Sequence, residues 1–240
     1  MFFNYLEYFI KFIGFTYFFV AGGLYLIFYV VFKKELLHLK IQNKFPETNM
    51  IIDEILISIR TIIIFGMVTA CYFYFIPKQY QLLYYDISEY GKAYFAISII
   101  NSILAHDFIF YCTHRLMHHK KLFFIHKRHH LSTNPTSLAA YSFGPIEAFI
   151  QSLTFLFIIS IMPIHLYGML IMHAWNIFFN AMGHLGYDIN KNVSDIFKIT
   201  VMDANYHNLH HSDLKFNGRY GLYFKFWDRV FNTDGKIQKS

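Results

Sequence analysis

Residues 114–130 of this 240-residue chain read HRLMHHKKLFFIHKRHH. The segment opens with an H-x-x-x-H motif and closes with an H-x-x-H-H motif, and H-x-x-H-H returns at residues 207–211. On a helix, positions i, i+3 and i+4 lie on one face, so we expect each H-x-x-H-H motif to direct three imidazoles to one side. Neutral imidazole is the commonest metal ligand in proteins, so the pattern predicts a metal site. The predicted ligands are His114, His118, His126, His129, His130, His207, His210 and His211.

Eight histidines exceed the needs of one tetrahedral ion and predict two metal ions with four or five ligands each. Asn180 and His184 are one helical turn apart, so we expect His184 as the ninth imidazole and Asn180 as a weaker or water-bridged ligand. His173 is either a substitute ligand or a buried polar residue. His119 points about 100° away from its neighbour on a helix, and His106 suits a supporting or gating role equally well, so both are left out.

The clustered histidines differ from a tag-like tract because apolar residues such as Phe123 and Ile125 are interleaved with them. The two cysteines, Cys71 and Cys112, lie in apolar runs and cannot form a disulfide framework or a cysteine-based zinc site. An imidazole-rich site is compatible with iron, zinc, copper or nickel. If the substrate is apolar and its C–H bonds are unactivated, a redox cofactor such as non-haem iron with oxygen is required.

The composition predicts a membrane protein, since 55% of residues are hydrophobic, 15% are charged and 50 of 240 are aromatic. The run 12–32 has 21 residues without a charge, enough to cross a bilayer. It is followed at once by Lys33 and Lys34 and is too long for a cleavable signal peptide, so we expect it to be retained. Further apolar runs are expected at 55–76, at 93–111, and in a hairpin of 146–162 and 166–183 broken at Pro163.

Loop charges predict the orientation of these spans. The loop after the first run is rich in lysine, and short basic loops stay on the cytoplasmic side. Counting spans onward places all the histidine motifs on that side as well. The net charge of +6 then follows from this bias, and we expect no nucleic-acid partner.

In these motifs the chain resembles the fatty acid hydroxylase and sterol desaturase superfamily of integral membrane di-iron enzymes, from about residue 106 to residue 234. The order and spacing of the motifs carry the resemblance more than any one of them. Besides the three histidine motifs, the matching segments are His106-Asp107 through Tyr111, Leu122 to His130, Asn134-Pro135-Thr136, Pro145-Ile146-Glu147, Gly183-His184-Leu185-Gly186-Tyr187, Tyr220-Gly221 and Trp227-Asp228-Arg229.

The resemblance implies an all-α, multi-pass membrane bundle with a cytoplasmic histidine-rich helical cap that holds two iron ions. It implies O2-dependent hydroxylation or desaturation of a lipid, with electrons from a cytochrome b5-like or ferredoxin-like partner. Zinc can take the place of iron during overexpression. We expect N-terminal transmembrane helices in 1–92, a catalytic domain in 93–235 and a short tail in 236–240. The membrane would be the endoplasmic reticulum in a eukaryote or the cytoplasmic membrane in a bacterium.

The chain departs from the family pattern at three positions. Cys112 stands where the family usually has Trp, Gly144 where His is common, and Asn232 where Gly is usual. The missing histidine at 144 affects a supporting contact rather than the cage. Carboxylates near the motifs either orient ligand imidazoles or cap helices and pair with arginines; they are Asp107, Glu147, Asp188 and Asp203.

Two other function classes compete with a lipid oxygenase. A histidine-rich metal transporter, or a metal-binding protein without turnover, could use the same residues. A transport pathway would place polar ligands near the bilayer midplane, whereas these motifs lie beyond the ends of the expected spans. A sterol, a fatty acyl chain or another apolar lipid fits the pattern equally well, and no motif selects among them or separates hydroxylation from desaturation.

Overall fold

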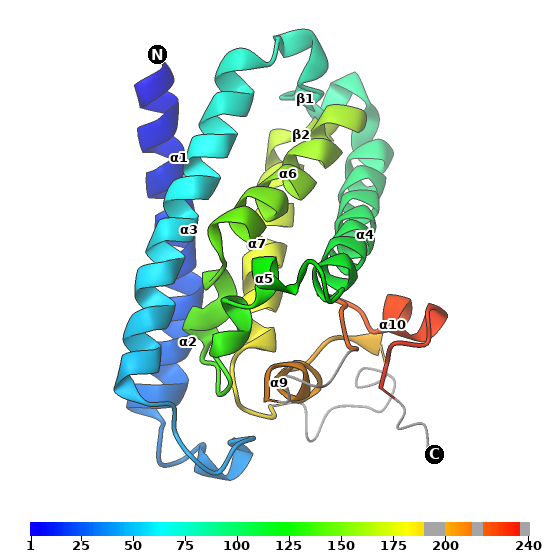
Figure 1. Cartoon of the computed structure of the whole chain (residues 1–240). Helices are drawn as coiled ribbons and strands as arrows, with labels where there is room; N and C mark the ends of the chain where they lie inside the picture. Colours follow the sequence, from blue (N-terminus) through cyan, green and yellow to red (C-terminus); the bar gives the residue numbers. More distant parts are fainter. Residues whose placement is uncertain (190–199, 213–217, 236–240) are drawn as a thin grey trace.

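Five long helical segments lie side by side in the part of the chain that the structure describes, residues 1–189, 200–212 and 218–235 (Figure 1). This computed structural model confirms the expected helical bundle. The tail predicted at 236–240 lies outside the described residues. The long elements are α1 (Phe2–Tyr17), continued to Val31 by η1 (Phe18–Gly22), α2 (Gly23–Tyr25) and η2 (Leu26–Val31), then α3 (Thr48–Phe75), α4 (Gly91–Met117), α6 (Pro145–Ile161) and α7 (Leu166–Gly183).

Three of these segments are long and apolar enough to cross a bilayer, namely Phe2–Val31, Thr48–Phe75 and Gly91–Met117. Each contains or largely overlaps an expected span and extends beyond it. The expected hairpin is present as α6 and α7, because the residue before Pro163 is driven out of the helical region and ends α6. The 17 residues of α6 rise only about 26 Å, less than the roughly 30 Å of hydrocarbon in a typical bilayer.

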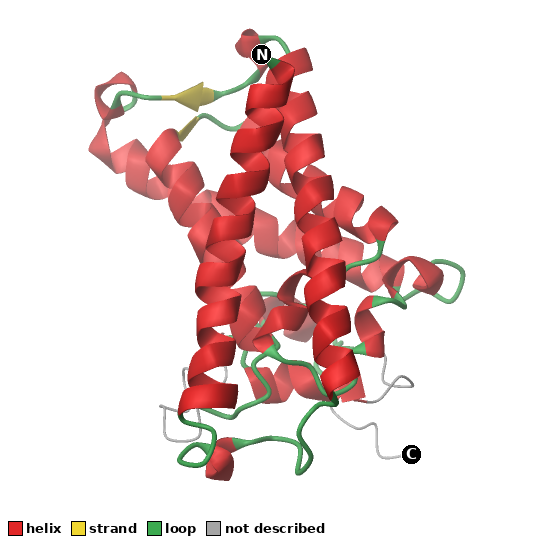
Figure 2. Ribbon diagram, turned by 90° about the vertical axis from the view of Figure 1, so that its left-hand side faces the viewer, coloured by secondary structure: helices red, strands yellow, loops and turns green. Residues whose placement is uncertain are grey.

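Short elements close the two ends of the bundle (Figure 2). At the end that holds the N-terminus, β1 (Leu83–Tyr84) pairs in parallel with β2 (Ile164–His165). Toward the opposite end lie α5, α9 and α10 (Figure 1). Their bounds and those of the remaining short helices are α5 (Phe123–His126), α9 (Ala204–Ser212), α10 (Phe226–Val230), η3 (Leu37–Leu39), η4 (Lys78–Tyr80), η5 (Ile87–Glu89), η6 (His129–Leu131) and η7 (Ser137–Tyr141).

The loop that carries η7 is fixed to the first two long helices by polar contacts. Buried Glu54 of α3 accepts hydrogen bonds from the hydroxyl group and the backbone N–H of Thr136 at 2.5 and 3.3 Å. Tyr17 and Ser58 both donate to the carbonyl oxygen of Leu138, at 2.7 and 3.0 Å. Arg60 donates to the carbonyl oxygen of Phe143 at 2.8 Å. These contacts fix the position of the segment that follows the second histidine motif.

The first and second spans pack closely because α3 has a glycine where they cross. A Cβ atom on Gly66 would lie 2.5 Å from Cγ1 of Ile10 and 3.2 Å from its backbone nitrogen. A small residue at such a crossing lets two helices approach within membranes. Gly23, by contrast, has no heavy atom within 4 Å of the same built position.

We therefore expect Gly66→Val to destabilise the fold by about 1–3 kcal/mol, the usual penalty of overpacking. The matched change Gly23→Val should stay within about 0.5 kcal/mol of the wild type. Thermal unfolding of the detergent-solubilised protein measures both effects. Equal midpoints for the two variants would show that the crossing does not depend on Gly66.

Candidate metal centre

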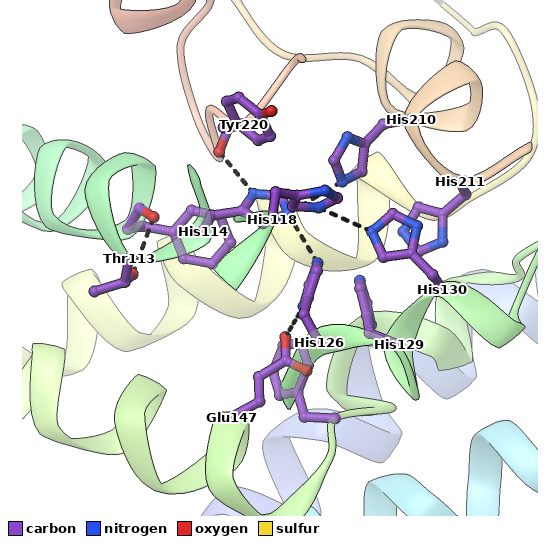
Figure 3. Close-up of polar contacts among 12 residues, drawn as sticks. Thr113, His114, His118, His126, His129, His130, Glu147, His210, His211 and Tyr220 are labelled. Carbon is purple, nitrogen blue, oxygen red and sulfur yellow. Dashed lines mark hydrogen bonds and ion pairs between the residues drawn. The ribbon is translucent and has the colours of Figure 1, made fainter. Parts of the chain in front are cut away.

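Nine histidines converge in two sets near α5 and α9. Figure 3 shows part of both sets. Within each set, one possible ligand atom per residue lies within 4.8 Å of the others. Eight of the nine side chains are buried, and His118 is half-buried. The five-histidine set consists of His114, His118, His126, His130 and His210, and the four-histidine set consists of His129, His184, His207 and His211.

Each H-x-x-H-H motif is divided between the two sets. Its first and fifth positions join one set and its fourth position joins the other. The three imidazoles of each motif lie together on one side, as expected, but that side faces two neighbouring sets rather than one. On an α-helix the fifth position lies about 40° from the first and the fourth about 60° in the other direction, so the three side chains diverge enough to reach two neighbouring centres. In the H-x-x-H-H motif at residues 126–130, the backbone also changes from α5 to the 3-10 turn η6 between His126 and His129.

Three rings of the five-histidine set are held in one tautomer by oxygen acceptors behind them. A ring that donates from Nδ1 to a carbonyl or carboxylate oxygen has its lone pair on Nε2. Figure 3 draws two of these contacts as dashed lines. His114 Nδ1 lies 2.9 Å from the carbonyl oxygen of Tyr220, His126 Nδ1 2.5 Å from Oε1 of Glu147, and His210 Nδ1 2.7 Å from the carbonyl oxygen of Gly218.

The lone pairs of these three rings face one another. Nε2 of His114 lies 2.9 Å from Nε2 of His126 and 3.1 Å from Nε2 of His210. Two neutral acceptors at this separation repel, because neither has a proton to share. A cation between the nitrogens turns the repulsion into ligation, so the donor set fits a metal ion.

The four-histidine set leads to the same conclusion. His184 donates from Nδ1 to the carbonyl oxygen of Asn180 at 2.7 Å, which leaves a lone pair on Nε2. That Nε2 lies 3.0, 3.2 and 3.1 Å from Nε2 of His129, His211 and His207. His207 and His211 are 3.1 Å apart at the same atoms. A ring nitrogen carries either one proton or one lone pair, and it points in a single direction in the plane of the ring. Hydrogen bonds therefore cannot satisfy His184 Nε2 and its three Nε2 neighbours at the same time.

The nitrogen spacing also suits ligation. Nitrogens about 2.1 Å from a common ion lie about 3.0 Å apart at right angles and about 3.4 Å apart at tetrahedral angles. Seven Nε2–Nε2 separations within the sets are 2.9–3.2 Å, and all the ligand atoms of one set lie within 4.8 Å of one another. Nine nitrogens in two groups therefore match two ions with five and four imidazole ligands.

The cage rings that lie outside the membrane spans are buried, and burial favours the neutral form of imidazole, which is the form that binds metal. Desolvation lowers the pKa of His118 and His184 to about 4. Desolvation, with repulsion between neighbouring rings as the smaller cause, lowers the pKa of the remaining rings well below the ordinary value of 6.5. These rings are His126, His129, His130, His207, His210 and His211.

Of the four carboxylates near the motifs, Glu147 contacts a cage histidine. It is 1% exposed and lies directly behind His126. Asp107 and Asp203 instead hold the backbone and neighbouring side chains: Asp107 accepts from the N–H groups of Leu222 and Tyr223, whereas Asp203 accepts from the N–H of Tyr206 and pairs with Lys225 at 2.5 Å. The backbone N–H of Asp188 donates to the carbonyl oxygen of Leu39.

The remaining sequence candidates fall outside the two sets. His119 is exposed, while His106 and His173 are in the wall of a cavity beside the centre. Asn180 is buried and reaches His184 through its backbone oxygen, whereas its side chain lines the cavity. Metal ligation by Asn180 and by the nine histidines stays a prediction.

The backbone acceptors behind the rings were not visible in the sequence, although a motif contains one of them. Asp228 accepts hydrogen bonds from the N–H groups of Tyr220 and Gly221 at 2.8 and 3.0 Å. It thereby fixes the carbonyl oxygen of Tyr220 behind His114. The Tyr220-Gly221 and Trp227-Asp228-Arg229 segments are thus part of the support of the cage.

A mainly apolar cavity lies between the long helices and ends beside the cage. Helices α1, α3, α4, α6 and α7 all contribute to its wall, which is rich in phenylalanine. At the cage end, the centroid of the Phe110 ring lies 5.2 Å from that of His114, and the centroid of the Phe143 ring lies 5.1 Å from that of His129.

Single replacements test the ligand sets. We expect His129→Ala and His210→Ala, one from each set, to lower the bound metal from two ions per chain to about one or fewer, because each removes one of only four or five ligands. His38→Ala, at an exposed histidine outside both sets, serves as the control and should keep the wild-type content. Mass spectrometry of iron and zinc together measures the result. Wild-type metal content in either cage variant would refute the ligand assignment.

Glu147→Gln tests the support behind His126. Loss of such an outer partner typically weakens metal affinity 10–100-fold, and we expect about this loss for the five-histidine set. The same change at exposed Glu89 should have no effect. Titration with a competing chelator measures the affinity, and an unchanged affinity in Glu147→Gln would show that the carboxylate does not support the ligand.

Comparison with known proteins agrees with these motifs. Residues 99–233, more than half of the chain, match the fatty acid hydroxylase family. Lathosterol oxidase of Rattus norvegicus is 29% identical over 189 residues, which cover 76% of this chain and 60% of that protein. A Delta(7)-sterol 5(6)-desaturase of Gibberella zeae is 32% identical over 213 residues, which cover 87% of this chain and 62% of that protein.

A methylsterol monooxygenase of Danio rerio is 33% identical over 134 residues, 54% of this chain and 44% of that protein. The chain spans about three fifths of the length of the first curated relatives it matches. No solved structure matches it. From the family match over 99–233 and the ordered histidine motifs within it, the chain belongs to the fatty acid hydroxylase family.

Proposed function

We propose that this protein is a membrane oxidoreductase that holds two iron ions in its histidine cage and uses O2 to hydroxylate or desaturate a lipid of the sterol or fatty-acyl type. The observation that carries the proposal is the apolar cavity that ends beside nine converging imidazoles. The names of the relatives, lathosterol oxidase and Delta(7)-sterol 5(6)-desaturase, support the choice of a lipid substrate.

Two iron ions in this cage would supply the redox chemistry that an unactivated C–H bond requires, because acidic or nucleophilic side chains do not attack such a bond. The protein's own residues would bind the ions and orient the ligand rings. Acceptors behind His114, His126, His184 and His210 keep Nε2 directed at the two centres. A preorganised cage of this kind needs little rearrangement to bind its ions.

The cavity wall selects and places the lipid. Phe110 and Phe143 contact cage rings on one side and the cavity on the other, so they form an apolar floor where the substrate meets the centre. This floor limits the access of water from the cavity side and favours hydrocarbon over polar substrates. The reacting carbon of the lipid would lie against these two rings.

The proposed division into transmembrane helices at 1–92 and a catalytic domain at 93–235 gives both parts a role in the substrate site. Phe12 of α1 and Phe65 of α3 line the same cavity as Phe155 of α6. The first two spans would therefore form the lipid-facing half of the pocket. The cage would belong to the second part, which contains all nine histidines.

We further propose a multi-pass topology in which the cage end faces the cytoplasm. Basic residues after the first span support this orientation. A cytochrome b5-like or ferredoxin-like donor would deliver electrons at that face. The membrane would be the endoplasmic reticulum in a eukaryote and the cytoplasmic membrane in a bacterium.

A metal transporter receives less support from the geometry. Transport sites lie near the bilayer midplane between spans, whereas these histidines lie in two sets at or beyond the ends of the long helices α4 and α7. The adjoining cavity is lined mainly by apolar side chains, which do not carry a hydrated ion.

Lipid mass spectrometry of host membranes tests the function. Expression of the wild type should convert at least one membrane lipid to a product that has gained one oxygen or lost two hydrogens. The His129→Ala/His210→Ala double variant, expressed to the same level, should give the lipid profile of the empty host. Identical profiles for wild type and double variant in a host supplied with sterols and fatty acids would contradict the proposal.

A further inference from the structure

A connected group of polar side chains interrupts the apolar wall of the cavity near the cage. His106, Gln151 and Asn176 line the cavity from α4, α6 and α7. Gln151 is one helical turn after Glu147, whose carboxylate lies behind His126. Asn176 is one helical turn before Asn180, whose carbonyl oxygen accepts from His184. A helical turn rises about 5.4 Å, so this polar group lies roughly one turn from the supports of the cage.

Asn176, His106 and the backbone of Gln151 are linked by a continuous chain of hydrogen bonds through Tyr223 and Thr154. Asn176 Nδ2 donates to the Tyr223 hydroxyl oxygen at 3.0 Å, and that hydroxyl donates to Nδ1 of His106 at 3.0 Å. His106 then donates from Nε2 to the Thr154 hydroxyl oxygen at 3.3 Å, and Thr154 donates to the carbonyl oxygen of Gln151 at 2.8 Å. In this assignment every hydroxyl group and both nitrogens of His106 are used once.

The side-chain amide of Gln151 carries a donor that this chain of hydrogen bonds does not use. Its residue is 8% exposed, and its side-chain nitrogen Nε2 is buried with no hydrogen-bond partner among the described residues. A buried amide N–H without an acceptor is unfavourable in a cavity wall. A ligand that brings an oxygen atom to this position would satisfy it.

We propose that the Gln151 side-chain amide binds a neutral oxygen-bearing group of the substrate, a hydroxyl group, and so makes this protein selective for hydroxylated neutral lipids. The inference rests on the proposed function and names the substrate class for that site. The hydroxyl end lies near the cage, and the hydrocarbon runs along the apolar wall toward Phe73 and Met169. Oxidation then takes place a few bonds from the hydroxylated carbon rather than in the middle of a long chain.

The charge of the cavity wall excludes the other common lipid heads. Among the described residues that line the cavity, none is a lysine, arginine, aspartate or glutamate. An ionised carboxylate or phosphate buried there would have no partner of opposite charge, which is strongly unfavourable. A hydroxyl group needs only one donor or acceptor, and Gln151 offers both.

The test measures equilibrium binding to the full-length protein in lipid nanodiscs with three probes, namely lathosterol, the same hydrocarbon without its hydroxyl group, and palmitate. The variant is Gln151→Met, which removes the amide at nearly constant volume. The control is Gln81→Met, the same change outside the residues that line the cavity. Metal content and the unfolding midpoint of each protein confirm that the cage and the fold are intact.

We expect the ratio of the deoxy dissociation constant to the lathosterol dissociation constant to fall about tenfold from wild type to Gln151→Met, because a site that hydrogen-bonds a hydroxyl group rejects the analogue that lacks it. Gln81→Met should keep the wild-type ratio. Since the ratio is compared between proteins, the different partition of the two probes into the bilayer cancels. Palmitate should bind most weakly.

An unchanged ratio in Gln151→Met, or palmitate binding more tightly than lathosterol, overturns this inference and leaves the proposed lipid oxidation intact. Binding of none of the three probes to the wild type, together with an unchanged host lipid profile, overturns both. A tenfold fall in the ratio with unchanged metal content supports the assignment of Gln151 as the hydroxyl-binding residue.

Discussion

Repulsion between imidazole lone pairs is the constraint on which this structure depends. Four rings are locked with Nε2 as an acceptor, and in the five-histidine set three such nitrogens face one another at 2.9 and 3.1 Å. Neutral rings do not hold that arrangement alone, whereas two cations would stabilise it. The remaining elements bring the rings together from distant parts of the chain: α4 contributes His114 in its last turn, α7 is followed by His184, and α9 contributes three rings.

Local sequence patterns predicted which histidines come together, because the spacing of the histidines is a local property. The i, i+4 pairs at 114/118 and 207/211 meet as expected, and His184 joins the four-histidine set. The same patterns did not predict how each motif divides between the two sets. Whether the fourth position of an H-x-x-H-H motif reaches one centre or the other depends on where a second helix places its own rings, and short-range periodicity holds no information about that.

The supports of the cage were also beyond sequence reasoning. The carbonyl oxygens of Tyr220 and Gly218 are backbone atoms, and every residue has one. Asp107 of α4 accepts a hydrogen bond from the backbone N–H of Tyr223, and Asp228 holds the backbone at Tyr220 within the C-terminal segment. These contacts between distant residues place the Tyr220 carbonyl oxygen behind His114. The role proposed for Gln151 was also not predictable, because a single glutamine in an apolar helix matches no sequence motif. Its unpaired amide points to a ligand only because the residue lines the cavity.

Cage and cavity together explain why a protein of this family needs a bundle rather than a single histidine-bearing helix. The long spans form the apolar wall, the shorter α6 and α7 bring Glu147 and Asn180 to the cage, and α3 fixes the η7 loop through Glu54 and Thr136. Phe110 and Phe143 lie between the apolar cavity and the histidine cage.

The most direct test of the central claim is anomalous X-ray diffraction from crystals of the protein loaded with iron. The account predicts two separate iron peaks per chain, one enclosed by the Nε2 atoms of the five-histidine set and the other by those of the four-histidine set. A single peak shared by all nine rings, or no peak inside the cage at full iron loading, would contradict it.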